Sequence, residues 1–102
     1  MAAYDNPGGS LICGRQTVTT AGTAVQLSTT PTSILEVAIT AETDNTGYIV
    51  VGASDVVASL STRKGVPLAA GGSITLGVDN LTDVYLDSTV STDGVTYTAV
   101  VA

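Results

Sequence analysis

The residue types that usually carry out chemistry are scarce in this chain. It contains no His, a single Cys at position 13, and nine Asp and Glu residues. Without His the commonest general base and metal ligand is missing, and one thiol cannot form an internal disulfide or a zinc site. The carboxylates could in principle hydrolyse glycosides, but the chain has no Trp or Phe to line the apolar pocket that a carboxylic acid catalyst needs. We therefore predict a non-enzymatic protein with no catalytic residue and no cofactor.

Two oxygen-rich segments are the only candidates for a metal site. The first holds Asp79, Asn80 and Asp83, and the second holds Asp44 and Asn45. Calcium takes six to eight oxygen ligands, and the spacing of these residues matches no known calcium loop. The segment DNLTD fits equally well a turn whose Asx side chains bond their own backbone. We predict no metal.

The charge balance limits the partners of the protein. Three Lys and Arg against nine Asp and Glu give a net charge of -6, which repels phosphate backbones and anionic lipids. We therefore expect no nucleic-acid or membrane partner. Arg63 and Lys64 are adjacent, and this basic loop either docks on an acidic partner or is a solvated turn.

The composition and the pattern of the chain predict an all-β fold. Thr, Val and Ile make up 36 of the 102 residues, and β-branched residues favour strands. Short alternating runs separated by turn residues predict a small antiparallel β-sandwich of about eight strands. The runs are residues 16–20, 24–28, 34–40, 48–52, 56–61, 73–78, 83–87 and 95–101.

Alternation also predicts which residues face the core, because neighbouring side chains in a strand point to opposite faces. On this basis we expect one inward set in each of four runs. The sets are Leu35, Val37 and Ile39; Ile74, Leu76 and Val78; Val84 and Leu86; and Val95, Tyr97, Ala99 and Val101.

The first fifteen residues are predicted to form an extended N-terminal arm, leaving 16–102 as the sandwich domain. Pro7, Gly8, Gly9 and Gly14 interrupt any regular pattern there. The arm also contains an apolar cluster that is costly to leave in water, so it either packs on its own domain or reaches a neighbouring subunit. Leu11, Ile12, Cys13 and Arg15 are its candidate contact residues, and we expect Cys13 to be a small buried apolar residue there.

The apolar content predicts that stability depends on assembly. Four Tyr residues supply all the aromatic area, and much of the remaining apolar content is Val and Ala. A core built this way is thin for a domain of about 100 residues, which favours association with further copies or with another protein. We expect a homo-oligomer, either a dimer or a trimer.

Four segments resemble small virion proteins of tailed bacteriophages. They are NTGYIVVGASDVVAS, TRKGVPLAAGGSITLGV, NLTDVYLDS and DGVTYTAVVA, and together they make up half of the chain, 51 of its 102 residues. The features that carry the resemblance are a strand after an Asn-Gly type of turn, a glycine-bounded loop, and a closing strand pair with Val-Tyr-x-Asp and Val-Thr-Tyr. Such sequences are similar to capsid decoration, or cement, proteins.

The resemblance implies a jelly-roll-like sandwich that binds the outside of a phage head and stabilises it by bridging subunits of the major capsid protein. It implies contacts through the arm and through the basic loop at Arg63 and Lys64. The expected location is the capsid surface of the virion after assembly in the host cytoplasm, since the first residues do not read as a secretory signal. The alternative is a phage tail, head-fibre or host-adhesion β domain, in which loops bind a glycan or a receptor.

Overall fold

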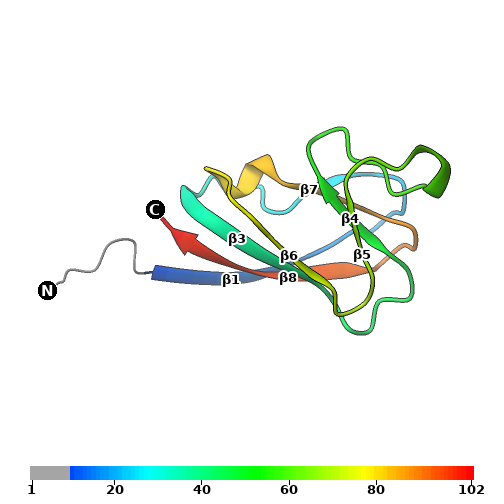
Figure 1. Cartoon of the computed structure of the whole chain (residues 1–102), viewed down its shortest axis with the longest axis horizontal. Coiled ribbons are helices and arrows are strands. Elements are labelled where there is room, and N and C mark those ends of the chain that lie inside the picture. The colour runs from blue at the N-terminus through cyan, green and yellow to red at the C-terminus, as the bar shows by residue number, and fades with distance from the viewer. Residues whose placement is uncertain (1–9) are drawn as a thin grey trace, which may run out of the picture.

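The computed structural model describes residues 10–102 and is built from strands and two short 3-10 helices (Figure 1). The strands are β1 (Ser10–Thr17), β2 (Val25–Gln26), β3 (Ile34–Ala41), β4 (Ile49–Gly52), β5 (Val66–Leu68), β6 (Ser73–Leu76), β7 (Tyr85–Ser88) and β8 (Gly94–Val101). The helical turns are η1 (Leu60–Thr62) and η2 (Leu81–Asp83). Within residues 10–102, no helix has the length and apolar character needed to cross a membrane.

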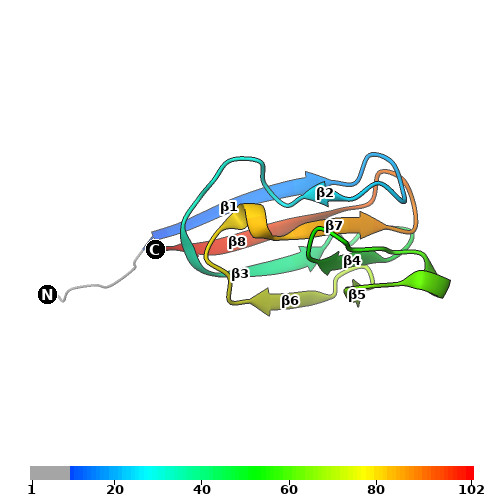
Figure 2. The ribbon, with the colours of Figure 1, turned by 90° about the horizontal axis from the view of Figure 1, so that it is seen from above.

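The strands form two four-stranded sheets that pack face to face (Figure 2). The first, in the order β1-β8-β3-β6, contains all three eight-residue strands and is called the long sheet; the second, in the order β2-β7-β4-β5, is called the short sheet. Every pairing is antiparallel, and strand 1 pairs with 8, 2 with 7, 3 with 6 and 4 with 5. This order results when one long hairpin is rolled up, which is the jelly-roll arrangement. The predicted all-β antiparallel sandwich of about eight strands is confirmed.

Side chains from both sheets fill the space between them. Val37, Ile39, Val95 and Ala99 come from the long sheet and are fully buried. Ile49, Val51 and Leu86 come from the short sheet and belong to the same cluster. The inward faces predicted for three other strands are confirmed. The predicted residues within 74–78, 84–86 and 95–101 are buried or pack partly buried against the core, except that Val101 is simply half-buried.

Strand β3 departs from strict alternation at its start. Its register with β8 shifts between Ile34 and Glu36, so that Ile34 is buried and Leu35 is 57% exposed. A β-bulge adds one residue to a strand and moves the residues before it to the opposite face. The prediction that Leu35 shares the inward face of Val37 and Ile39 is therefore wrong.

The strand boundary at the N-terminus lies earlier than the sequence predicts. Residues 10–15, predicted as irregular arm, belong to β1 and pair with β8 in unbroken register. A Cβ built on Gly14 would lie 2.5 Å from the Tyr97 ring, so glycine here lets that ring lie against β1 and does not interrupt the strand. The sequence left open whether this segment packs on its own domain or reaches a neighbouring subunit. Ile12 packs against the core of its own domain. The remainder of the predicted arm, residues 1–9, lies outside the described residues.

The segment between β4 and β5 also differs from expectation. Residues 56–61 do not form a strand. Val57 makes one isolated bridge to Lys64, and the last two residues of the run belong to η1. The strand lies instead at Val66–Leu68, in the stretch predicted as a turn. Pro67 argued against a strand here, because proline cannot donate a backbone hydrogen bond. Proline is nevertheless compatible with a strand at the edge of a sheet, and β5 is an edge strand.

Two buried aspartates hold the loops at the ends of the strands. Asp87 Oδ1 accepts hydrogen bonds from the backbone N–H groups of Gly22 and Ser88, at 2.9 and 2.8 Å, and its Oδ2 accepts one from Ala58 at 2.9 Å. Asp93 receives the N–H groups of residues 46 and 47 in the same way, at 3.1 and 2.8 Å. Each carboxylate thus joins segments that are far apart in the sequence and satisfies backbone donors that would otherwise lack partners.

Candidate docking surface

The outward face of the short sheet is covered by the chain itself. Val50 points away from the main core and forms a second buried cluster with Val56 and Ala58, against which Tyr85 packs. Val56 and Ala58 come from the segment between β4 and β5, so this segment lies over the short sheet. The apolar side chains that suggested a strand there are buried on top of a sheet.

Arg63 stabilises this covering segment through contacts with Ala58 and Tyr48. Its guanidinium donates from Nε and Nη2 to the carbonyl oxygen of Ala58, at 3.0 and 2.9 Å, and lies 5.6 Å from the centre of the Tyr48 ring. Lys64 is different, since its ammonium is exposed and lies 3.9 Å from an Asp55 carboxylate oxygen. The basic loop therefore contains one cation engaged within the fold and one largely free in solvent.

The outward face of the long sheet has no such cover in the described part of the chain. The registers of β1, β8, β3 and β6 place its side chains in three cross-strand rows. The rows are Leu11, Val100 and Glu36; Cys13, Thr98, Ala38 and Thr75; and Arg15, Thr96, Thr40 and Ser73. We call these eleven residues the open face. Only Glu36 and Arg15 carry a charge, although the whole chain has a net charge of -6.

One end of the open face is apolar. Leu11 in β1 is 66% exposed and is the cross-strand neighbour of the half-buried Val100. Leu35, displaced outward at the bulge of β3, adds a second exposed leucine close to this row. Contiguous exposed apolar surface, unlike single scattered side chains, marks an interaction surface, and these two leucines with Val100 form the apolar end of this surface.

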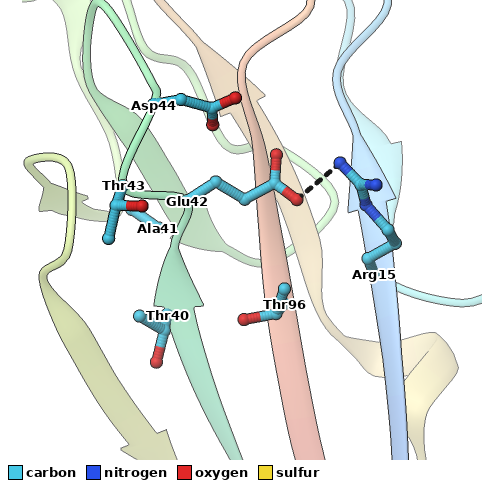
Figure 3. A pocket seen from close by; sticks show the side chains of 7 residues that line it. All are labelled: Arg15, Thr40, Ala41, Glu42, Thr43, Asp44 and Thr96. Atoms are coloured by element: carbon cyan, nitrogen blue, oxygen red, sulfur yellow. Dashed lines mark ion pairs between the residues drawn. The ribbon is translucent and has the colours of Figure 1, made fainter.

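The other end of the open face is polar and contains a shallow depression of about 490 Å³ (Figure 3). Arg15 from β1 and Thr96 from β8 line one side, and residues 40–44 line the other. An Arg15 Nη2 to Glu42 Oε2 ion pair of 2.7 Å crosses from β1 to the end of β3, with the Glu42 side chain only 14% exposed. The positive charge of Arg15 is thus balanced where it stands, which keeps this face close to neutral.

The predicted contact residues do not form one surface. Leu11, Cys13 and Arg15 lie on the open face, while Ile12 points to the core. Arg63 and Lys64 lie on the segment that covers the short sheet, on the opposite side of the sandwich. The prediction that Cys13 is buried is wrong: it is exposed, with its sulfur 3.7 Å from Thr98 Oγ1, because β1 turns alternate side chains outward.

The oxygen-rich segment around η2 is a helix cap. Asn80 Oδ1 accepts hydrogen bonds from the backbone N–H groups of Thr82 and Thr32 and from the Thr82 hydroxyl. These bonds fix η2 and join it to the connection between β2 and β3, as the turn interpretation of DNLTD predicts. Among residues 10–102, no three His, Cys, Asp or Glu side chains gather where they could hold a metal ion.

The tyrosines that could form a sugar-binding platform have separate environments. Tyr97 lies under Gly14, Tyr85 packs on the covered face of the short sheet, and Tyr48 is 47% exposed beside Arg63. Tyr4 is outside the described residues. The open face, with its long strands and near-neutral rows, is the surface best suited to contact with another protein.

No protein-family model, curated protein or solved structure matches this chain.

Proposed function

We propose that this protein is a non-enzymatic capsid decoration protein of a tailed bacteriophage, which binds the outside of the phage head and stabilises it by bridging subunits of the major capsid protein. The observation that carries the proposal is the open face, an uncovered surface with few charges on a strongly acidic chain. The resemblance of residues 45–102 to phage virion proteins supplies the class of partner.

The chemistry of the open face suits a contact between proteins. Its middle row contains Cys13, Thr98, Ala38 and Thr75, which are small and uncharged side chains, and burying the threonine hydroxyls costs free energy only where they are left without a hydrogen bond. Threonine hydroxyls can exchange their hydrogen bonds with water for hydrogen bonds to a partner. The leucines at the apolar end supply buried area on docking, at about 25 cal/mol for each Å² removed from water.

The distribution of charge supports the same orientation. The eleven residues of the open face include one acid, Glu36, and one base, Arg15, and so have no net formal charge, which leaves the net charge of -6 to the rest of the protein. With the open face against a shell, the acidic remainder points to solvent and keeps decorated particles from adhering to one another. Arg63 and Lys64 lie on the other side of the sandwich and then face away from the shell, so the proposed orientation does not include the shell contact that the sequence predicted for this basic loop.

The proposal is tested by stripping heads of the protein and adding it back. A ligand that binds only the intact lattice favours the intact shell over its dissociated parts by mass action. We therefore expect stripped heads to release DNA at a lower temperature than decorated heads, and the purified protein to restore the original temperature in a saturable manner. Stripped heads that are as heat-resistant as decorated ones, combined with a loss of host attachment, would instead support the adhesion alternative.

A further inference from the structure

The free edges of the two sheets differ greatly in how they are protected. Four strands lie at edges: β1 and β6 in the long sheet, β2 and β5 in the short sheet. Strand β2 has two residues, β5 has three and contains Pro67, and β6 has four. Natural proteins shorten edge strands or place proline in them to prevent pairing with other chains. Strand β1 has eight residues, no proline and no bulge in its pairing with β8.

The unpaired side of β1 offers a regular set of backbone groups. Val18, just after β1, donates its N–H to Asp93 at 2.9 Å and accepts at its carbonyl oxygen from Thr92 at 2.8 Å, so its groups point toward the β8 side. Because these directions alternate along a strand, residues 10, 12, 14 and 16 face β8. The N–H and C=O groups of Leu11, Cys13 and Arg15 face outward, and no strand within residues 10–102 pairs with them. The Thr17 N–H, next in this series, is taken by the Gln16 side chain at 3.0 Å.

We infer that this edge is the seam of a dimer, in which β1 of two copies pair antiparallel across a two-fold axis. Centred on Cys13, the pairing places Cys13 opposite its own copy and Leu11 opposite Arg15 of the other chain. Each outward N–H and C=O of these three residues then has a partner. Arg15 is the only charged residue of β1, and this register keeps the Arg15 side chains of the two copies apart. Each Arg15 also forms an ion pair of 2.7 Å with Glu42 of its own chain.

This pairing would join two long sheets into one eight-stranded sheet and make their open faces continuous. Leu11 and Cys13 would lie beside the seam, so the exposed leucine would be covered partly by the aliphatic stem of Arg15 from the other copy. The contact is confined to one strand edge and buries less than the roughly 1,200 Å² at the lower end of standard interfaces. We therefore expect a concentration-dependent dimer, with a dissociation constant on the order of micromolar or weaker.

The test uses two substitutions at one position in the full chain. Proline in Cys13→Pro removes an N–H that the monomer does not use and that points away from the sheet, a position where strands accept proline. Cys13→Ser keeps the N–H and serves as the matched control. In sedimentation equilibrium over a range of concentrations, we expect wild type and Cys13→Ser to dimerise and Cys13→Pro to stay monomeric with an unchanged circular dichroism spectrum. If the proline variant is unfolded, Cys13→Lys replaces it, because two lysines directly opposite repel each other.

Chemical cross-linking reports the register directly. Residues opposite each other in a hydrogen-bonded antiparallel pair have Cα atoms about 5.5 Å apart, so a short bismaleimide is expected to link two wild-type chains through Cys13. The control is Cys13→Ser combined with Ser73→Cys, which moves the thiol to the other edge strand of the same face; it is expected to give no linked dimer. A wild type that is monomeric at every concentration, a dimer that survives Cys13→Pro, or equal cross-linking of both thiols would overturn the inference. Because all measurements use the chain alone, they are independent of whether it binds phage heads.

Discussion

Replacing Asp87 by alanine is expected to lower the free energy of unfolding by about 2 to 4 kcal/mol. The substitution removes the acceptor for three backbone N–H groups, those of Gly22, Ala58 and Ser88. Hydrogen bonds to a charged group contribute about 1.5 to 3 kcal/mol, and a buried donor left without a partner costs about 1 to 3 kcal/mol. The effects do not add fully, because a depression beside Asp87 admits water to some of these groups.

Thermal unfolding checks this prediction. A loss of 1 kcal/mol lowers the melting temperature of a domain of about 100 residues by roughly 4 to 8 °C, so we expect a decrease of at least about 8 °C. Asp79→Ala is the matched control: this aspartate is exposed and only its backbone oxygen accepts a hydrogen bond, from Ile34. It is expected to change stability by less than about 0.5 kcal/mol. Equal melting temperatures for the two variants would mean that water replaces the carboxylate without loss.

Placing a charge at Thr98 is expected to weaken attachment to stripped phage heads by at least about 100-fold. Thr98 is exposed in the middle row of the open face, on the central strand β8. A charge held there in a docked interface loses its water without gaining a partner, which costs several kcal/mol, and 100-fold corresponds to about 2.7 kcal/mol. Both Thr98→Glu and Thr98→Lys are expected to act in this direction, since the neutral character of the face is what matters. Binding isotherms on stripped heads measure the effect.

Two further variants separate this effect from others. Thr29→Glu adds the same charge at an exposed position in the connection between β2 and β3, and it should leave binding within about 3-fold of wild type, or less than about 0.7 kcal/mol. Thr98→Val keeps the shape of the side chain and replaces the hydroxyl by a methyl group, so its binding reports whether that hydroxyl bonds to the shell. If Thr98→Lys binds more tightly than wild type, electrostatic attraction to an acidic partner governs attachment and the neutral face does not.

The fold class could be predicted from the sequence because alternation and turn residues act locally. Val37 and Ile39, or Val95 and Ala99, reveal their buried face by period two alone, and the structure buries all four. Strand β1 could not be recognised in this way. Its Gly14 is required by the ring of Tyr97, 83 positions later in the chain, and no local pattern contains that contact.

The docking surface could be predicted only in part, since its residues are set by topology. Leu11, Cys13 and Arg15 were candidates through their apolar or basic character. Thr98, Ala38 and Thr75 became neighbours only once the strand order was known. The sequence also could not show which sheet is covered, because Val56 and Ala58 alternate like strand residues whether they lie within a sheet or on top of one.

A reconstruction by electron cryomicroscopy of stripped heads to which the purified protein has been added back would test the proposed role most directly. The density should be resolved well enough to distinguish the long sheet from the short sheet. We expect the protein on the outer surface of the head, bridging neighbouring capsid subunits, with Thr98 and the rest of the open face against the shell and residues 53–65 toward solvent. Density with residues 53–65 against the shell and the open face toward solvent would contradict the proposed orientation, and density confined to the tail would contradict the proposed function itself.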